Sequence, residues 1–146
     1  MSDRMKLARA YQAALFAGRM EEVGRCMTQD VVYWVAGRPP IGGTWVGRDA
    51  VLRAFDRREF GLGPADWGSE DLERTWYDAA DDRVLVEIRE RSWLRSAPDD
   101  VLDQRTCVVI RFQDGLIAEM RDYTDTAAYE GFITRHRKDL PKFAEP

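Results

Sequence analysis

Histidine and lysine are scarce in this chain of 146 residues, and their scarcity excludes several kinds of chemistry. The single histidine, His136, lies in a basic run near the C-terminus. A histidine-rich metal site is therefore excluded, and a Ser-His-Asp or Cys-His device would have to recruit that one residue. Lysine occurs only at Lys6, Lys138 and Lys142, so we expect no interior Schiff-base lysine.

Cysteine pairs and nucleotide-binding glycine motifs are also missing. Cys26 and Cys107 lie far apart and form no CxxC pair, so we expect two reduced, hydrophobic thiols. The sequence has no GxGxxG or GxxxxGK[ST] loop, which removes the usual signature of a nucleotide cofactor. An enzyme built on this chain would use no cofactor and no metal, and its reactive groups would be carboxylates, tyrosines, arginines and water.

Long apolar runs and a strong positive charge are absent as well. No run approaches the roughly 20 apolar residues of a membrane span, and the segment 1–7 is polar with no apolar stretch behind it. The formal net charge is −4 and the pI is near 5.1, whereas a general nucleic-acid binder needs a basic face. We therefore expect a cytoplasmic protein that binds neither nucleic acid nor a membrane.

The residues that are present predict one domain over 1–146, with a core over about 3–130 and a C-terminal helix and tail over 127–146. Apolar spacing predicts helices over 3–18, 20–27, 47–60 and 127–137, the third ended by Gly61–Pro64. β-Branched runs and alternation predict strands over 31–35, 44–46, 72–78, 83–95, 102–113 and 116–123. Asp114-Gly115 is a strong signal for a hairpin turn.

The order of these elements, helices first and then a long antiparallel meander, indicates an α+β fold. A curved sheet with helices on one side encloses a concave apolar space, which is the usual setting of a small-molecule site.

Three segments resemble known proteins. The segment Arg9–Gly18 resembles the first helix of ketosteroid isomerase, and Gly43–Val51 resembles the glycine turn before the third helix of SnoaL-like proteins. Asp114–Asp125 resembles the last hairpin of limonene epoxide hydrolase. All three belong to the nuclear-transport-factor-two-like superfamily, so the resemblance implies a cone-shaped curved antiparallel sheet wrapped by helices. That fold carries isomerases, hydrolases, cyclases, dehydratases and inert binding modules.

The resemblance to ketosteroid isomerase keeps only one of three catalytic positions. Tyr11 matches the tyrosine that stabilises the oxyanion, but the general-base aspartate falls near Trp34 and the protonated aspartate near Val108. Steroid isomerisation is therefore rejected.

The resemblance to limonene epoxide hydrolase keeps three of five positions. Arg91 matches the arginine of its Arg-x-Asp pair, Asp122 matches its second aspartate, and Tyr33 matches its water-holding tyrosine. Trp93 replaces the first aspartate, and Val35 replaces an asparagine. In SnoaL-like cyclases one aspartate on the sheet is the acid/base for an aldol closure, and Asp122 is the residue that we assign to that role.

Alternation along 83–95 leaves two alternatives for the side that faces the cavity. One face carries Leu85, Glu87, Arg89, Arg91 and Trp93, and the other carries Val84, Val86, Ile88, Glu90 and Ser92. Alternation favours the valine face as the core, with Arg91 in solvent or at a dimer interface. The resemblance instead turns Arg91 and Trp93 into the cavity, which would need a β-bulge or a second covered face such as a dimer interface.

The expected function is cofactor-free acid/base chemistry on a small hydrophobic molecule, with a non-catalytic ligand-binding or dimerisation module as the alternative. The reaction would be epoxide hydrolysis, aldol-type cyclisation or dehydration of a polyketide-like or terpenoid-like substrate. The expected catalytic residues are Asp122, Arg91 as its ion-pair partner, and Tyr33. The expected substrate-binding residues are Tyr11, Trp34, Trp45, Trp76, Trp93 and Met120. Since Tyr33 and Trp34 point to opposite faces, at most one of them lines the cavity. We also expect a homodimer through the outer face of the sheet.

Overall fold

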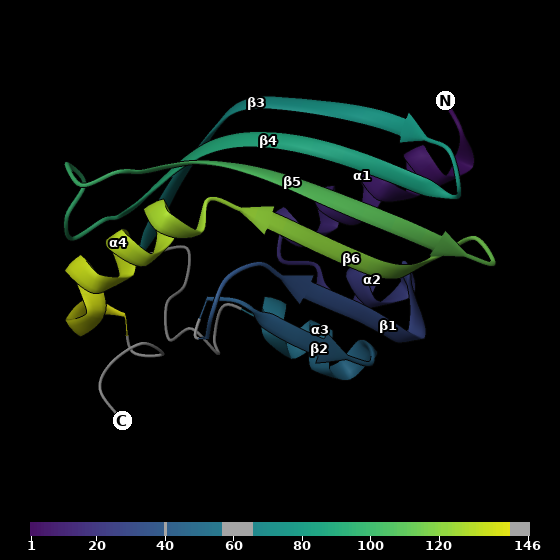
Figure 1. The fold of residues 1–146 in the computed structure, drawn as a ribbon, viewed down its shortest axis with the longest axis horizontal. Helices are drawn as coiled ribbons and strands as arrows, with labels where there is room; N and C mark the ends of the chain where they lie inside the picture. Colours follow the sequence, from purple (N-terminus) through teal and green to yellow (C-terminus); the bar gives the residue numbers. More distant parts are fainter. Residues whose placement is uncertain (40, 57–65, 141–146) are drawn as a thin grey trace.

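A single six-stranded sheet with four α-helices makes up the computed structural model, which describes residues 1–39, 41–56 and 66–140 (Figure 1). The elements are α1 (Asp3–Phe16), α2 (Met20–Arg25), β1 (Met27–Val35), β2 (Gly43–Val46), α3 (Arg48–Phe55), β3 (Trp67–Ala79), β4 (Arg83–Leu94), β5 (Leu102–Gln113), β6 (Leu116–Thr124), α4 (Thr126–His136) and the short 3₁₀ helix η2 (Arg137–Asp139). The strand order is β2-β1-β6-β5-β4-β3. The expected α+β fold is confirmed.

Strands β3 to β6 form the antiparallel meander that alternation predicts. Asp114 and Gly115 adopt φ values of 52° and 77°, the signs of a type I′ turn, and the flanking Gln113 and Leu116 pair. Strand β1 differs from the expectation, because it lies beside β6 in parallel while all other pairs are antiparallel. This one parallel pair brings Val35 next to Asp122.

Two strands begin earlier than their sequence suggests. Strand β1 starts at Met27, which pairs with Ile117, and β3 starts at Trp67, which pairs with Leu94. Most residues of the two added segments, 27–30 and 67–71, are polar or glycine, so backbone pairing with a neighbouring strand outweighs their weak β-propensity. Helix α3 ends at Phe55, and the expected stop at Gly61–Pro64 lies outside the described residues, as does the tail from residue 141.

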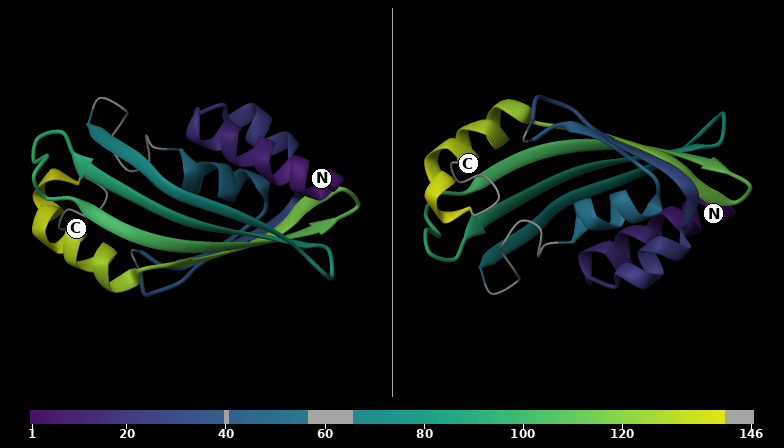
Figure 2. Two further views of the ribbon diagram at one scale, coloured as in Figure 1. Left: turned by 90° about the horizontal axis from the view of Figure 1, so that it is seen from above. Right: turned by 90° about the horizontal axis from the view of Figure 1, so that it is seen from below.

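The inner face of the sheet has a polar band between two apolar blocks. Going along the strands, the first block contains Val84, Val86, Val108, Ile110 and Met120, all buried. The polar band follows and consists of Glu90, Ser92, Gln104, Thr106, Asp122 and Thr124. The second block, Leu94 and Leu102, packs against Phe132 and Ile133 of α4. Each apolar block has its own cover, because α1 to α3 gather at one end of the sheet and α4 lies at the other (Figure 2).

Helix α4 is fastened to the β4–β5 loop by a buried histidine. His136 is 8% exposed, and its Nε2 lies 2.6 Å from the Asp100 carboxylate, which also binds Arg135 at 2.8 Å. The basic helix end expected from the sequence is thus an anchor of the helix. Within the described ranges no helix has the length and apolarity that crossing a membrane requires.

Candidate functional site

A cavity of about 420 Å³ lies over the polar band, between the two covered ends of the sheet. Its size falls within the range of small-molecule sites. Aromatic side chains form much of its wall: Tyr11, Phe16, Tyr33, Trp45, Phe55, Trp67, Tyr129 and Phe132. The polar band forms the floor, so the cavity has an aromatic side and a hydrogen-bonding side.

The carboxyl group of Asp122 is set into this cavity from β6. Its Oδ2 accepts a hydrogen bond of 3.0 Å from the Tyr33 hydroxyl, and its Oδ1 is shielded from solvent with no hydrogen-bond partner among the described residues. Burial raises the pKa of Asp122 to about 6, an effect that the Tyr33 hydrogen bond opposes and the negative Glu90 adds to. A carboxyl group with this pKa can both accept and return a proton near neutral pH.

Tyr33 is held in place by two aromatic neighbours. Its ring stacks on Trp45 at a centroid distance of 5.6 Å and meets the edge of Phe55 at 4.9 Å. Burial first, and then the neighbouring Asp122, raise the pKa of Tyr33 well above its usual value. The phenol therefore stays protonated and donates to the carboxylate. Tyr11 is 3% exposed and lines the same cavity, so both expected tyrosines reach it.

A second carboxylate, Glu90, lies on the floor of the cavity. Its Oε1 accepts a hydrogen bond of 3.1 Å from Gln104. The expected site residues do not include Glu90, although alternation places it on the same strand face as Val86 and Ile88. A charged residue on an apolar strand face was the signal that could have identified it.

The structure corrects the expected pairing of Arg91 with Asp122, because Arg91 lies on the other face of the sheet. Its Nε is 3.4 Å from Asp103, and its side chain is 44% exposed. Strand β4 pairs with β5 without a break in register over 83–92, so no bulge turns Arg91 inward. Val84 and Val86 are fully buried under the helices instead, which also removes them as part of a dimer face.

Three of the expected tryptophans lie away from the cavity. Trp34 points to the outer face and meets Tyr123 edge-on at 5.1 Å. Trp76 packs against the first apolar block, and the Arg9 guanidinium lies 5.3 Å from its ring centroid. Trp93 covers Gly68, where an added Cβ would lie 2.2 Å from the indole. The physical reason for Trp34 and Trp93 is strand alternation, which sends both side chains outward.

Of the two remaining expected substrate-binding residues, Trp45 lies in the cavity lining and Met120 lies in the core. Trp45 lines the cavity, as expected. Met120 is fully buried in the core, on the inner face but outside the cavity lining. Trp67, which the expected site omits, lines the cavity beside Phe132 at a centroid distance of 6.0 Å. Its strand, β3, begins earlier than the sequence suggests, and this is what brings it there.

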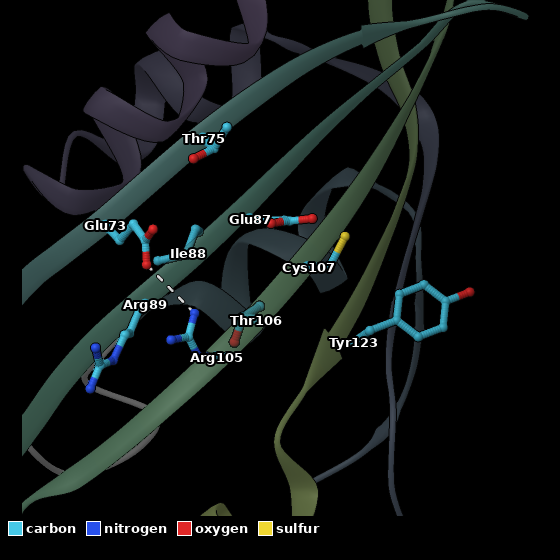
Figure 3. A pocket seen from close by; sticks show the side chains of 9 residues that line it. All are labelled: Glu73, Thr75, Glu87, Ile88, Arg89, Arg105, Thr106, Cys107 and Tyr123. Atoms are coloured by element: carbon cyan, nitrogen blue, oxygen red, sulfur yellow. Dashed lines mark ion pairs between the residues drawn. The ribbon is translucent and has the colours of Figure 1, made fainter.

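The outer face of the sheet has its own, smaller hollow of about 270 Å³ (Figure 3). Charges of both signs surround it, including an ion pair of 3.5 Å between Arg105 and Glu73. Cys107 also faces it, and burial raises the pKa of that thiol. In the part of the chain that the structure describes, no group of three or more histidine, cysteine, aspartate or glutamate side chains could hold a metal ion.

Comparison with known proteins identifies relatives over most of the chain. The family model described as the SnoaL-like domain matches residues 8–120. The uncharacterized protein Rv0034 of Mycobacterium tuberculosis is 28% identical over 130 residues, which are 88% of this chain and 94% of the relative.

Solved structures show the same fold at lower identity. An LEH-like epoxide hydrolase from M. tuberculosis is 20% identical, with a TM-score of 0.65 over 91% of this chain and 90% of the other. A proposed polyketide cyclase from Xanthomonas campestris pv. campestris is 16% identical, with a TM-score of 0.68 over 87% of this chain and 93% of the other. Solved NTF2-like proteins share this fold too, which confirms the fold family expected from the sequence.

Proposed function

The chain belongs to the SnoaL-like domain family, and on this premise we propose that it is a cofactor-free enzyme that moves a proton through Asp122 on a small hydrophobic molecule. The observation that carries the proposal is the state of that carboxyl group. One oxygen is held by Tyr33, the other is buried without a partner among the described residues, and the surrounding cavity is largely aromatic.

Proton removal from carbon next to a carbonyl, as in an aldol-type cyclisation, fits the site best. In this step the carboxylate of Asp122 takes the proton, the C–H electron pair forms the enolate, and the carboxyl group later returns the proton to the product. Tyr33 positions the carboxylate through Oδ2. The neighbour described as a polyketide cyclase agrees with this chemistry. Epoxide hydrolysis is favoured less, because Arg91 binds Asp103 on the opposite face of the sheet. In addition, Trp93 stands where the epoxide hydrolase has the first of its two aspartates.

The pH dependence of proton removal tests the proposal. With β-tetralone as a probe, deuterium exchange in D₂O is expected to have a kcat/KM that falls about tenfold per pH unit below about pH 6 and is constant above it. The base must be ionised to take a proton, so activity is lost as pH falls through its pKa. A rate that rises toward acidic pH, or the absence of enzyme-dependent exchange with this and other aryl ketones, would contradict the assignment and favour a non-catalytic binding module.

Replacing Tyr33 with Phe is expected to move the acidic limb of this profile to higher pH. The Tyr33 hydrogen bond stabilises the ionised carboxylate, so its loss raises the pKa of Asp122 further. The matched control is Tyr123→Phe, since Tyr123 lies on the outer face and is 45% exposed. The measurement is the same exchange profile for both variants, and an unmoved limb in Tyr33→Phe would show that the two groups are not coupled.

We also propose that two copies associate through the outer face of the sheet. That face carries exposed apolar side chains, with Val46 66% exposed and Tyr123 45% exposed. It also carries both signs of charge, at Glu73 and Arg105, which suits a two-fold contact of one surface with itself. Sedimentation equilibrium is expected to show a dimer that Tyr123→Asp weakens, and a wild-type monomer at micromolar concentration would contradict it. The cytoplasmic location expected from the sequence stays a prediction.

A further inference from the structure

Four polar side chains on the cavity floor form a continuous chain of hydrogen bonds across three strands. The Thr106 hydroxyl donates to Thr124 at 3.1 Å, and the Thr124 hydroxyl donates to Oε1 of Gln104 at 3.2 Å. The amide Nε2 of Gln104 donates to Glu90 at 3.1 Å. All four residues line the cavity. One of them, Thr124, lies on the same strand as Asp122, β6, two residues further along.

The carboxylate at one end sets the direction of every bond in this chain. A carboxylate only accepts, so the amide of Gln104 must turn its NH₂ group toward Glu90 and its carbonyl oxygen toward Thr124. A carbonyl oxygen also only accepts, so the single hydroxyl proton of Thr124 must be donated to Gln104. Thr124 can then only accept a hydrogen bond from Thr106, and the hydroxyl proton of Thr106 is used in that bond.

The consequence is that this part of the cavity floor presents lone pairs to a ligand bound in the cavity. Both threonine oxygens have used their protons, and the ionised Asp122 beside them also only accepts. A hydroxyl or amine on a ligand would therefore find acceptors along β5 and β6, whereas a carbonyl or ether oxygen in the same place would face lone pairs. Among these four side chains, only the second amide hydrogen of Gln104 remains available as a donor.

We propose that this part of the cavity floor selects a planar ligand with hydrogen-bond donors, such as phenolic hydroxyls, on the edge that faces β5 and β6. The aromatic side chains opposite, including Trp45 and Trp67, would cover the ring of the ligand. The substrate of the proposed enzyme would then be a hydroxylated aryl ketone, a statement that rests on the proposed function because that function makes this cavity the substrate site. Recognition by these acceptors nevertheless needs no turnover, so binding measures it separately.

The test compares a naphthalene diol that has one hydroxyl on each ring with its dimethoxy analogue, which lacks both donors and is larger by two methyl groups. The change in preference between wild type and variants is therefore what reports on the donors, since the difference in size is the same for every protein. Quenching of tryptophan fluorescence at pH 8 gives both affinities, because Trp45 and Trp67 line the cavity. The wild-type protein is expected to bind the diol about tenfold more tightly, the effect of one ordinary hydrogen bond. In Thr124→Val the preference is expected to fall below about threefold, with the affinity for the dimethoxy probe kept within about twofold.

Thr106→Val is the second variant, because it removes an acceptor without leaving a carbonyl group unpaired. It is expected to reduce the preference for the diol in the same direction as Thr124→Val. Thr75→Val is the matched control on the outer face of β3, and it is expected to keep the wild-type preference. An equal preference in wild type, Thr124→Val and Thr106→Val would overturn the inference, as would a wild-type preference for the dimethoxy probe. Selective binding of the diol without proton exchange would overturn the proposed function and leave this inference standing.

Discussion

Replacing Asp122 with Asn is expected to lower kcat for proton removal by about 10²- to 10⁴-fold, the usual contribution of a positioned general acid or base. An amide has nearly the same shape as the carboxyl group, and its oxygen can still accept the hydrogen bond from Tyr33. It cannot take a proton. The expected result is therefore a loss in kcat with little change in the affinity for β-tetralone, measured by exchange kinetics and by fluorescence quenching.

The matched control for this loss is Asp103→Asn on the outer face of the sheet. Asp103 pairs with Arg89 and Arg91, away from the cavity, so its neutralisation is expected to leave the exchange rate unchanged. Full activity in Asp122→Asn would remove Asp122 from the reaction. Equal losses in both variants would point to a general effect of charge or folding.

The same substitution is expected to stabilise the protein at alkaline pH. Burial raises the pKa of Asp122 from 3.8 to about 6, so the native state favours the neutral acid. The stability that the raised pKa of Asp122 contributes is fully present below the unfolded pKa of 3.8, and it is lost as pH rises through the folded pKa of about 6. Asparagine does not ionise and escapes that loss. At pH 8 the free energy of unfolding of Asp122→Asn is compared with that of wild type, and the same difference is taken at pH 3. The difference at pH 8 is expected to exceed the difference at pH 3 by about 3 kcal/mol at most.

Urea unfolding of both proteins at these two pH values measures the gain. Asp103→Asn again serves as the control, because its arginine partners lower the pKa of Asp103 and the expected pH trend is opposite in sign. An Asp122→Asn protein that is less stable than wild type at pH 8 would contradict the burial of an unfavourable charge. A gain in stability together with a loss of turnover would mark the carboxylate as kept for function.

Much of the cavity floor follows from strand alternation. Alternation puts Val84, Val86 and Glu90 on one face of β4, and the same counting places Asp122 with Met120 on β6. Polar residues in the middle of an apolar face then indicate a place where the helices do not cover the sheet. Arg91 shows that alternation along its own strand, and not a match to a family motif by type of residue, decides which face of the sheet a side chain occupies.

Long-range pairing accounts for what local patterns did not supply. The parallel contact between β1 and β6 joins residues about ninety positions apart and decides that Tyr33 reaches Asp122. Similarly, Trp67 enters the cavity wall because β4 extends β3 toward the N-terminus with a ladder of backbone hydrogen bonds. Local propensity carries no information on either pairing, since both depend on which strand lies alongside.

The most direct test of the account is the titration of the Asp122 carboxyl carbon by ¹³C NMR, assigned by its absence in Asp122→Asn. A carboxyl group set into an aromatic cavity and bound by Tyr33 is expected to titrate with a midpoint near pH 6. A midpoint near 3.9, the value of an exposed aspartate, would place the group in water and contradict its role as the proton carrier.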